Sequence, residues 1–124
     1  MPLRQKSKKG VDQISTLQTV KRVREILGDK KGEDVVILDV HNLSTVTDFF
    51  IICTATSQRH AKSLAEHLRL ALKSEKIKPM HNDGLPEASW VVIDYIDFIV
   101  HIFIEQTREL YALEKLWGDA EKIE

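Results

Sequence analysis

Residues 90–103 read WVVIDYIDFIVHIF, and this stretch decides the fold. It holds the run 90–95 and all but the last residue of the run 98–104, both rich in β-branched and aromatic residues and separated by Ile96 and Asp97. Such runs are typical of β-strands. A two-residue link cannot make the crossover that parallel strands require, so the two strands are expected to form an antiparallel hairpin.

The register of this hairpin separates its residues into two faces. With Ile96 and Asp97 in the turn, Tyr95 lies opposite Phe98, and opposed residues share a face. The first face is nearly all apolar and is expected to pack under helices; it consists of Val91, Ile93, Tyr95, Phe98, Val100 and Ile102. The second face is mixed; it consists of Trp90, Val92, Asp94, Ile99, His101 and Phe103.

The mixed face has three interpretations. It could be half-buried, with a structural pair between Asp94 and the diagonally placed His101, and with Trp90 filling space. It could be an exposed docking surface, because an aromatic ring beside a charge and an imidazole is typical of interface hot spots. It could be catalytic or metal-binding, but no nucleophile, third ligand or glycine-rich phosphate loop accompanies it.

The division into faces depends on the link between the two strands. A tight two-residue turn needs positive φ, which the β-branched Ile96 resists. The link could therefore be longer or bulged, and a slip of one residue would exchange the two faces.

The rest of the chain predicts helices around further strands. A helical stripe runs from Ile14 to Leu27, and a second runs from an N-cap at Ser57 to about Glu75. Short buried strands are predicted at 35–40 and 49–55, with room for another near Met80, and a final helix is marked by Leu110, Leu113 and Trp117. The predicted order is α-β-β-α-(β)-β-β-α, an α+β fold with helices packed on a mixed sheet.

A length of 124 residues suits one domain, predicted at 11–118, between a basic tail at 1–10 and a charged tail at 119–124. Of the 18 Lys and Arg residues, four lie in the first ten, which hold no acidic residue, so the remainder carries 14 basic against 19 acidic side chains. Such a body is a poor general nucleic-acid binder and better suits a basic protein partner. No apolar run approaches a membrane span, so a cytoplasmic protein is expected.

Other candidate chemical groups have simpler structural explanations. The single Cys53 lies in an apolar run and is expected to be a buried hydrophobe rather than a nucleophile. In residues 54–60, TATSQRH, the amides at a helix start beside Arg59 and His60 could hold an anion, although capping by Ser57 is the simpler explanation. Ser57 beside His60 lacks the G-x-S-x-G elbow of a hydrolase, and Asp94 and Asp97 lack the alternating spacing that two-metal chemistry needs.

With these residues in view, the chain resembles the ribosomal silencing factor family, also called Iojap-related. The resemblance rests on ordered motifs from about Val35 to Trp117: STVTD at 44–48, FIICTATS at 50–57, Arg59-His60, WVVIDYID at 90–97, Val100-His101, Phe103 and RELYALEKLW at 108–117. Any one motif is weak, whereas the ordered set is specific.

The resemblance implies a nucleotidyltransferase-like fold that lacks the catalytic carboxylates, so neither enzymatic activity nor a cofactor or metal is expected. It implies docking on the large ribosomal subunit through large-subunit ribosomal protein fourteen, which sterically blocks joining of the small subunit. No membrane or sequence-specific nucleic acid is expected as a partner, and the mixed face could instead support a homodimer. A nucleotide-handling enzyme is the alternative function.

Carried over by position, the expected partner contacts are Trp90, Asp94, Tyr95, Asp97 and His101. Further motif positions, which could be structural, are Asp48, Thr54, Ser57, Arg59 and His60. The chain departs from the family pattern at Ile96 and Ala55, where glycine is common, and at Asp83, where glutamate is frequent.

Overall fold

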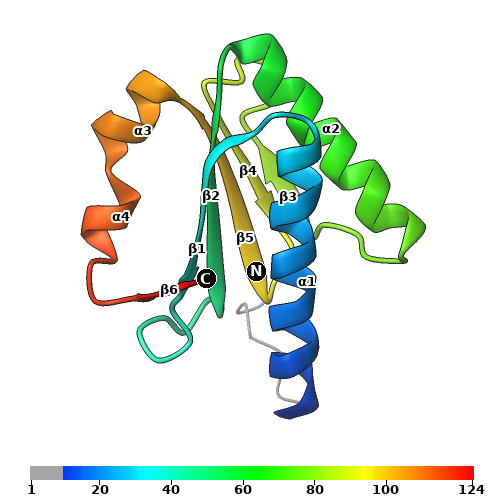
Figure 1. The fold of residues 1–124 in the computed structure, drawn as a ribbon, viewed down its shortest axis with the longest axis vertical. Coiled ribbons are helices and arrows are strands. Elements are labelled where there is room, and N and C mark those ends of the chain that lie inside the picture. Colours follow the sequence, from blue (N-terminus) through cyan, green and yellow to red (C-terminus); the bar gives the residue numbers. More distant parts are fainter. Residues whose placement is uncertain (1–9) are drawn as a thin grey trace.

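The computed structural model describes residues 10–124, with side chains described from Ser15 onward, and is built around one six-stranded sheet (Figure 1). The predicted basic tail at 1–10 falls almost entirely outside the described residues. The elements in chain order are α1 (Gly10–Asp29), β1 (Glu33–Asp39), β2 (Phe49–Ala55), α2 (Gln58–Ser74), β3 (His81–Asp83), β4 (Trp90–Asp94), β5 (Phe98–Ile104), α3 (Glu105–Tyr111), α4 (Leu113–Leu116) and β6 (Glu121–Ile123).

The sheet is mixed, as the sequence predicts. Its strand order is β3-β4-β5-β2-β1-β6, with β2 and β5 parallel at the centre and the other neighbours antiparallel. All seven residues of β2 are buried, which explains why its sequence, FFIICTA, shows no alternation of polar and apolar residues. The predicted α+β class is confirmed.

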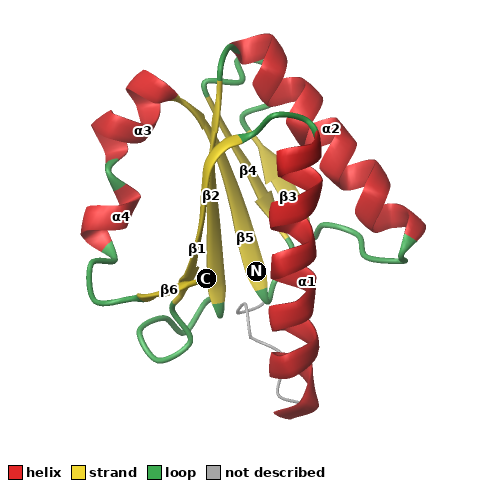
Figure 2. Ribbon diagram, in the orientation of Figure 1, coloured by secondary structure: helices red, strands yellow, loops and turns green. Residues whose placement is uncertain are grey.

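Helices cover both faces of the sheet (Figure 2). On one face α1 and α2 enclose the larger core, to which β4 and β5 contribute the apolar face predicted for the hairpin. On the other face α3 and α4 cover a smaller core built on Leu38, Val40, Phe50, Ile52 and Phe103. The mixed face of the hairpin therefore lies beneath α3 and α4 rather than open to solvent along its whole length.

The hairpin has the predicted register and a tight link. Trp90 pairs with Phe103 and Asp94 with Ile99. Ile96 adopts the positive φ that its side chain disfavours, +74°, and the Asp97 amide donates to the Tyr95 carbonyl at 2.9 Å, as in a γ-turn. The Asp94 carboxylate accepts a hydrogen bond from the Ile96 amide at 2.8 Å. The longer or bulged link considered from the sequence is wrong, because this side-chain bond holds the tight turn.

The C-terminal segment differs from the single helix and charged tail expected from the sequence. Ala112 takes a left-handed conformation, φ +48°, and its amide closes α3 on the Arg108 carbonyl at 2.9 Å. The chain then turns into α4, so that Leu113 and Trp117 pack on the smaller core. Beyond it, β6 pairs with β1, and the Ile123 carbonyl accepts a hydrogen bond from Arg24 at 3.1 Å.

Candidate functional site

Trp90 is the centre of an aromatic cluster on the mixed face. Its ring lies 4.4 Å from Tyr111 of α3 and stacks on Phe103 at 5.0 Å, measured between ring centroids. Its indole nitrogen donates to Nδ1 of His101 at 3.0 Å. The half-buried indole is thus fixed in orientation, with Tyr111 extending the cluster toward solvent.

His101 is buried, with 7% of its surface exposed, between Phe50 and Phe103. Because Nδ1 accepts from Trp90, the neutral ring carries its hydrogen on Nε2. Nε2 is buried and has no hydrogen-bond partner among the described residues. Burial lowers the pKa of the imidazole to about 4, an effect that the Asp94 carboxylate opposes. The expectation that His101 lies on the surface beside Trp90 is therefore wrong; His101 supports Trp90 from beneath.

The other three predicted contact residues lie at or beside the hairpin turn. The Asp94 carboxylate binds the Ile96 amide, and the Asp97 carbonyl accepts the Asp48 amide at 3.1 Å. Tyr95 faces the larger core on the opposite side of the sheet, where its ring stacks on Phe98 at 4.8 Å. Burial raises the pKa of Tyr95 to about 12. The structure thus brings Trp90 and His101 together and separates Tyr95 from them.

Three exposed apolar side chains lie on α3 and α4. Leu110 is 77% exposed, Tyr111 50% and Leu116 73%. The sequence predicts one helix marked by Leu110, Leu113 and Trp117, and this is wrong because the left-handed Ala112 breaks it into α3 and α4. No periodic signal in so short a segment distinguishes the exposed Leu110 and Leu116 from the partly buried Leu113.

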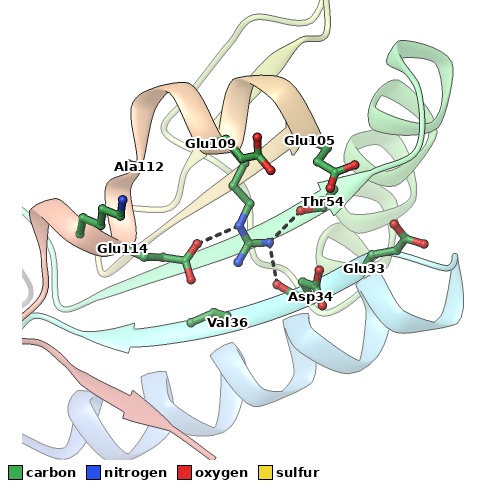
Figure 3. Close-up of a pocket in the computed structure, with 10 residues that line it drawn as sticks. Glu33, Asp34, Val36, Thr54, Glu105, Glu109, Ala112 and Glu114 are labelled. Carbon is green, nitrogen blue, oxygen red and sulfur yellow. Dashed lines mark hydrogen bonds and ion pairs between the residues drawn. The ribbon is translucent and has the colours of Figure 1, made fainter.

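Arg108 organises a polar cleft between α3, α4 and the start of β1 (Figure 3). Its guanidinium bonds a carboxylate oxygen of Glu114, the carbonyl of Asp34 and the hydroxyl of Thr54, each at 2.8 Å. The cleft has a volume of about 630 Å³, and carboxylates dominate its walls, from Glu33, Asp34, Glu105, Glu109 and Glu114. Thr54, a predicted motif position, thus serves to anchor α3 to the sheet.

The turn from β2 into α2 is closed by its own side chains. The Ser57 hydroxyl caps α2 by accepting the His60 amide at 3.0 Å, as the sequence predicts. His60 in turn accepts the Thr56 amide at 2.9 Å and contacts the Lys30 carbonyl with its other ring nitrogen at 2.8 Å. Of the predicted residues here only Arg59 remains exposed without such a role. These bonds favour the capping interpretation over an anion site.

Groups suited to metal or nucleophilic chemistry are not assembled in the part of the chain that the structure describes. Among the side chains described, from Ser15 onward, no three from His, Cys, Asp or Glu are placed to hold a metal ion. Cys53 is buried, and desolvation raises the pKa of its thiol to about 12. No helix among these residues has the length and apolar character needed to cross a membrane.

Comparison with known proteins identifies the family. A sequence model of the family described as "Ribosomal silencing factor during starvation" matches residues 13–124. The chain belongs to the ribosomal silencing factor family. Membership in this family confirms the resemblance drawn from the motifs between Val35 and Trp117.

Similar members of the ribosomal silencing factor family come from bacteria and plants. The chain is 40% identical to the ribosomal silencing factor of Halalkalibacterium halodurans, covering 77% of this chain and 82% of that protein. It is 40% identical to the one from Haemophilus influenzae, covering 80% and 97%. It is 34% identical to the mitochondrial Iojap-related protein of Arabidopsis thaliana, covering 90% and 63%.

Solved structures share the fold of this ribosomal silencing factor family member. A crystal structure from Chromobacterium violaceum matches with a TM-score of 0.80 at 31% identity, covering 82% of this chain and 85% of that one. A crystal structure from Bacillus halodurans matches with a TM-score of 0.77 at 32% identity, covering 87% and 98%.

Proposed function

We propose that this chain is a ribosome-associated regulator of translation that docks on the large ribosomal subunit through large-subunit ribosomal protein fourteen. Once docked, its bulk obstructs joining of the small subunit, so the mechanism is steric and needs no turnover. Membership in the ribosomal silencing factor family supports the ribosomal setting. The observation that carries the docking proposal is the fixed Trp90–Tyr111 pair, together with the exposed leucines of α3 and α4.

The proposed docking surface consists of Trp90, Leu110, Tyr111 and Leu116, with Asp94 and Asp97 at the hairpin end. Exposed aromatic and aliphatic side chains are typical anchors of protein interfaces. Buried beneath the surface, His101 holds the indole of Trp90 in one orientation, which reduces the side-chain entropy lost on binding. Tyr95 does not belong to this surface, but it supports the hairpin from the opposite side of the sheet by stacking on Phe98.

The charge around this surface fits a basic protein. Residues 105–124 hold six Asp and Glu against three Lys and Arg. Glu105 and Glu109 are exposed on α3, beside the apolar side chains. A negative rim around an apolar centre steers a positively charged partner and excludes acidic ones.

Co-sedimentation with purified large subunits tests the docking surface. Trp90→Ala is expected to weaken binding by about 2–4 kcal/mol, roughly 30- to 1000-fold, if the indole is a central anchor. Leu110→Ala/Leu116→Ala removes only exposed side chains, so it should fold normally and still weaken binding at least about tenfold. Leu43→Ala, in the loop between β1 and β2 and 47% exposed, is the matched control.

Wild-type affinity in both the Trp90 and the double-leucine variants, with native circular dichroism, would remove this surface from the proposal. Adding small subunits then tests the steric step. The wild-type chain is expected to reduce formation of complete ribosomes in a sucrose gradient, and the weakened variants are not. Undiminished subunit joining at saturating wild-type chain would contradict the mechanism.

A further inference from the structure

The solvent side of α2 carries a row of basic side chains. Arg59, Lys62, Arg69 and Lys73 are separated by three, seven and four residues, which places them along one side of the helix. The buried stripe of α2 faces the larger core, and the row runs beside it, with Arg59, Lys62 and Lys73 exposed and Arg69 half-buried. At a rise of about 1.5 Å per residue the row extends over roughly 21 Å.

The end of this row borders a groove between α2 and the segment leading into β3. The groove has a volume of about 430 Å³, and we call it the basic groove; it is lined by Glu66, Arg69, Leu70, Lys73, Lys78, Pro79 and Asn82. Its three cations face a single carboxylate. Asn82 belongs to β3, which pairs with β4, the strand that carries Trp90. The groove and the proposed docking surface therefore flank the same edge of the sheet.

The cations of the row and the groove lack partners among the residues described. No ion pair within 4.0 Å joins any of them to a carboxylate in that part of the chain. By contrast Glu75, just beyond α2, is engaged by Arg22 of α1 at 3.3 Å. Cations arranged in a row and left unpaired are available to an external polyanion.

Formal charge is segregated between the two faces of the molecule. Residues 58–78 carry six Lys and Arg and two Asp and Glu, whereas residues 105–124 carry three and six. The helix α2 and the pair α3–α4 cover opposite faces of the sheet (Figure 2). The α2 side is therefore basic and the α3–α4 side acidic, although the net charge of the whole chain is near zero.

We propose that the basic side of α2, with the basic groove, binds the phosphate backbone of RNA. The proposal rests on the ribosomal function proposed above, which places RNA beside the docked protein. The row is charged and carries no aromatic side chain, so it would contact phosphates without reading sequence. Docking through the acidic side would leave the basic side, on the opposite face of the sheet, free to contact RNA phosphates.

Fluorescence anisotropy of a short labelled RNA duplex tests this proposal without the ribosome. The wild-type chain is expected to bind weakly at about 50 mM salt and to lose affinity steeply toward about 200 mM. Arg69→Glu/Lys73→Glu is expected to weaken binding at least about tenfold and to reduce the salt slope by about two. Lys73→Glu/Lys78→Glu alters only exposed side chains and should weaken RNA binding by a similar factor. This second variant distinguishes loss of RNA binding from a folding defect caused by changing Arg69.

Lys115→Glu/Lys122→Glu is the matched control, since it makes the same change in net charge on the α4 and β6 side of the molecule. It is expected to retain nearly all RNA affinity. A separate variant with serine at Arg4, Lys6, Lys8 and Lys9 measures the contribution of the basic N-terminal residues.

Equal losses in the α2 variants and the control, or loss only in the serine variant, would overturn the proposal. Poly-glutamate of matched charge that bound as tightly, with the same dependence on Arg69 and Lys73, would overturn the assignment to RNA. The result is independent of the docking surface: RNA binding that depends on α2, together with unchanged sedimentation of Trp90→Ala, would support this inference and refute the docking surface.

Discussion

At the scale of single residues, His101 and Trp90 link the stability of the fold to the proposed docking surface. The imidazole is enclosed by Phe50, Phe103 and the indole, and it accepts rather than donates the hydrogen bond that orients Trp90. Protonation would place a charge in this apolar site and remove the lone pair on Nδ1 that the indole uses. The same group therefore makes both stability and the orientation of Trp90 sensitive to acid.

The pH dependence of stability follows from this burial. The pKa of His101 is about 4 in the folded protein against 6.5 for an ordinary histidine, so between these values the unfolded chain binds more protons. Stability is therefore expected to fall as pH decreases from about 6.5 to 4, by on the order of 3 kcal/mol from this group. Urea unfolding at several pH values, compared between wild type and His101→Gln, measures it.

His67→Gln provides the control, because its side chain lies on the polar side of α2. His101→Gln should flatten the slope of stability against pH more than His67→Gln does. An imidazole resonance of His101 that titrates near pH 6.5 in NMR spectra would contradict the assigned burial effect.

At the scale of elements, the β4–β5 hairpin combines a strained residue with a side chain that compensates for the strain. Ile96 adopts φ +74°, a conformation that costs a β-branched residue about 1–3 kcal/mol. Asp94 offsets part of this cost by accepting the Ile96 amide. The Asp97 carbonyl also binds the Asp48 amide, so the link holds the loop before β2 in place.

Substitutions in this link should change stability in opposite directions. Ile96→Gly is expected to raise the free energy of unfolding by about 1 kcal/mol, because glycine adopts positive φ without a steric cost. Asp94→Ala is expected to lower it by about 1 kcal/mol through loss of the bond to the Ile96 amide. Chemical denaturation measures both.

In the double variant, Asp94→Ala should still lower the free energy of unfolding, while Ile96→Gly relieves the backbone strain. If Ile96→Gly alone lowered the free energy of unfolding, the proposed strain at this link would be refuted.

At the scale of the whole molecule, segments distant in sequence complete the sheet and cover it. The final strand, β6, shields part of β1, and Ile123 packs at the margin of the larger core. Segments α3 and α4 return over the sheet and bury the smaller core. The result is a three-layer arrangement (Figure 1). Its two outer layers include segments of opposite charge, with α2 basic and α3–α4 acidic.

Removing residues 119–124 tests whether the C-terminal segment is a structural strand or only a charged tail. Truncation after Gly118 removes β6, the apolar contact of Ile123 and its carbonyl bond to Arg24. It is expected to lower the free energy of unfolding by about 1–3 kcal/mol. Lys122→Ala, which alters an exposed side chain of β6, should change it by less than about 0.5 kcal/mol. Equal stability of the truncated and complete chains would show that β6 contributes nothing.

How far the site could be predicted depends on the range of the interactions involved. The aromatic, acidic and imidazole residues of the mixed face were identified from alternation within one hairpin, and their register is confirmed. Their environment was left open: His101 is buried, as only the half-buried interpretation of the mixed face allowed, and Leu110 of the predicted final helix is exposed. Thr54 and Arg108 could be identified only as positions of family motifs. The hydrogen bond between them could not be predicted, because it joins residues 54 positions apart in the sequence.

The sequence by itself determined the two faces of the hairpin, the buried strand β2, the capped helix α2 and the α+β class. These features follow from periodicities of two and 3.6 residues, which are set by local backbone geometry. Only the tertiary structure decided that α3 and α4 cover the mixed face, that the last residues add a strand, and that opposite charges lie on opposite faces. The physical reason is that coverage depends on where distant segments return to the sheet, and no local pattern specifies that.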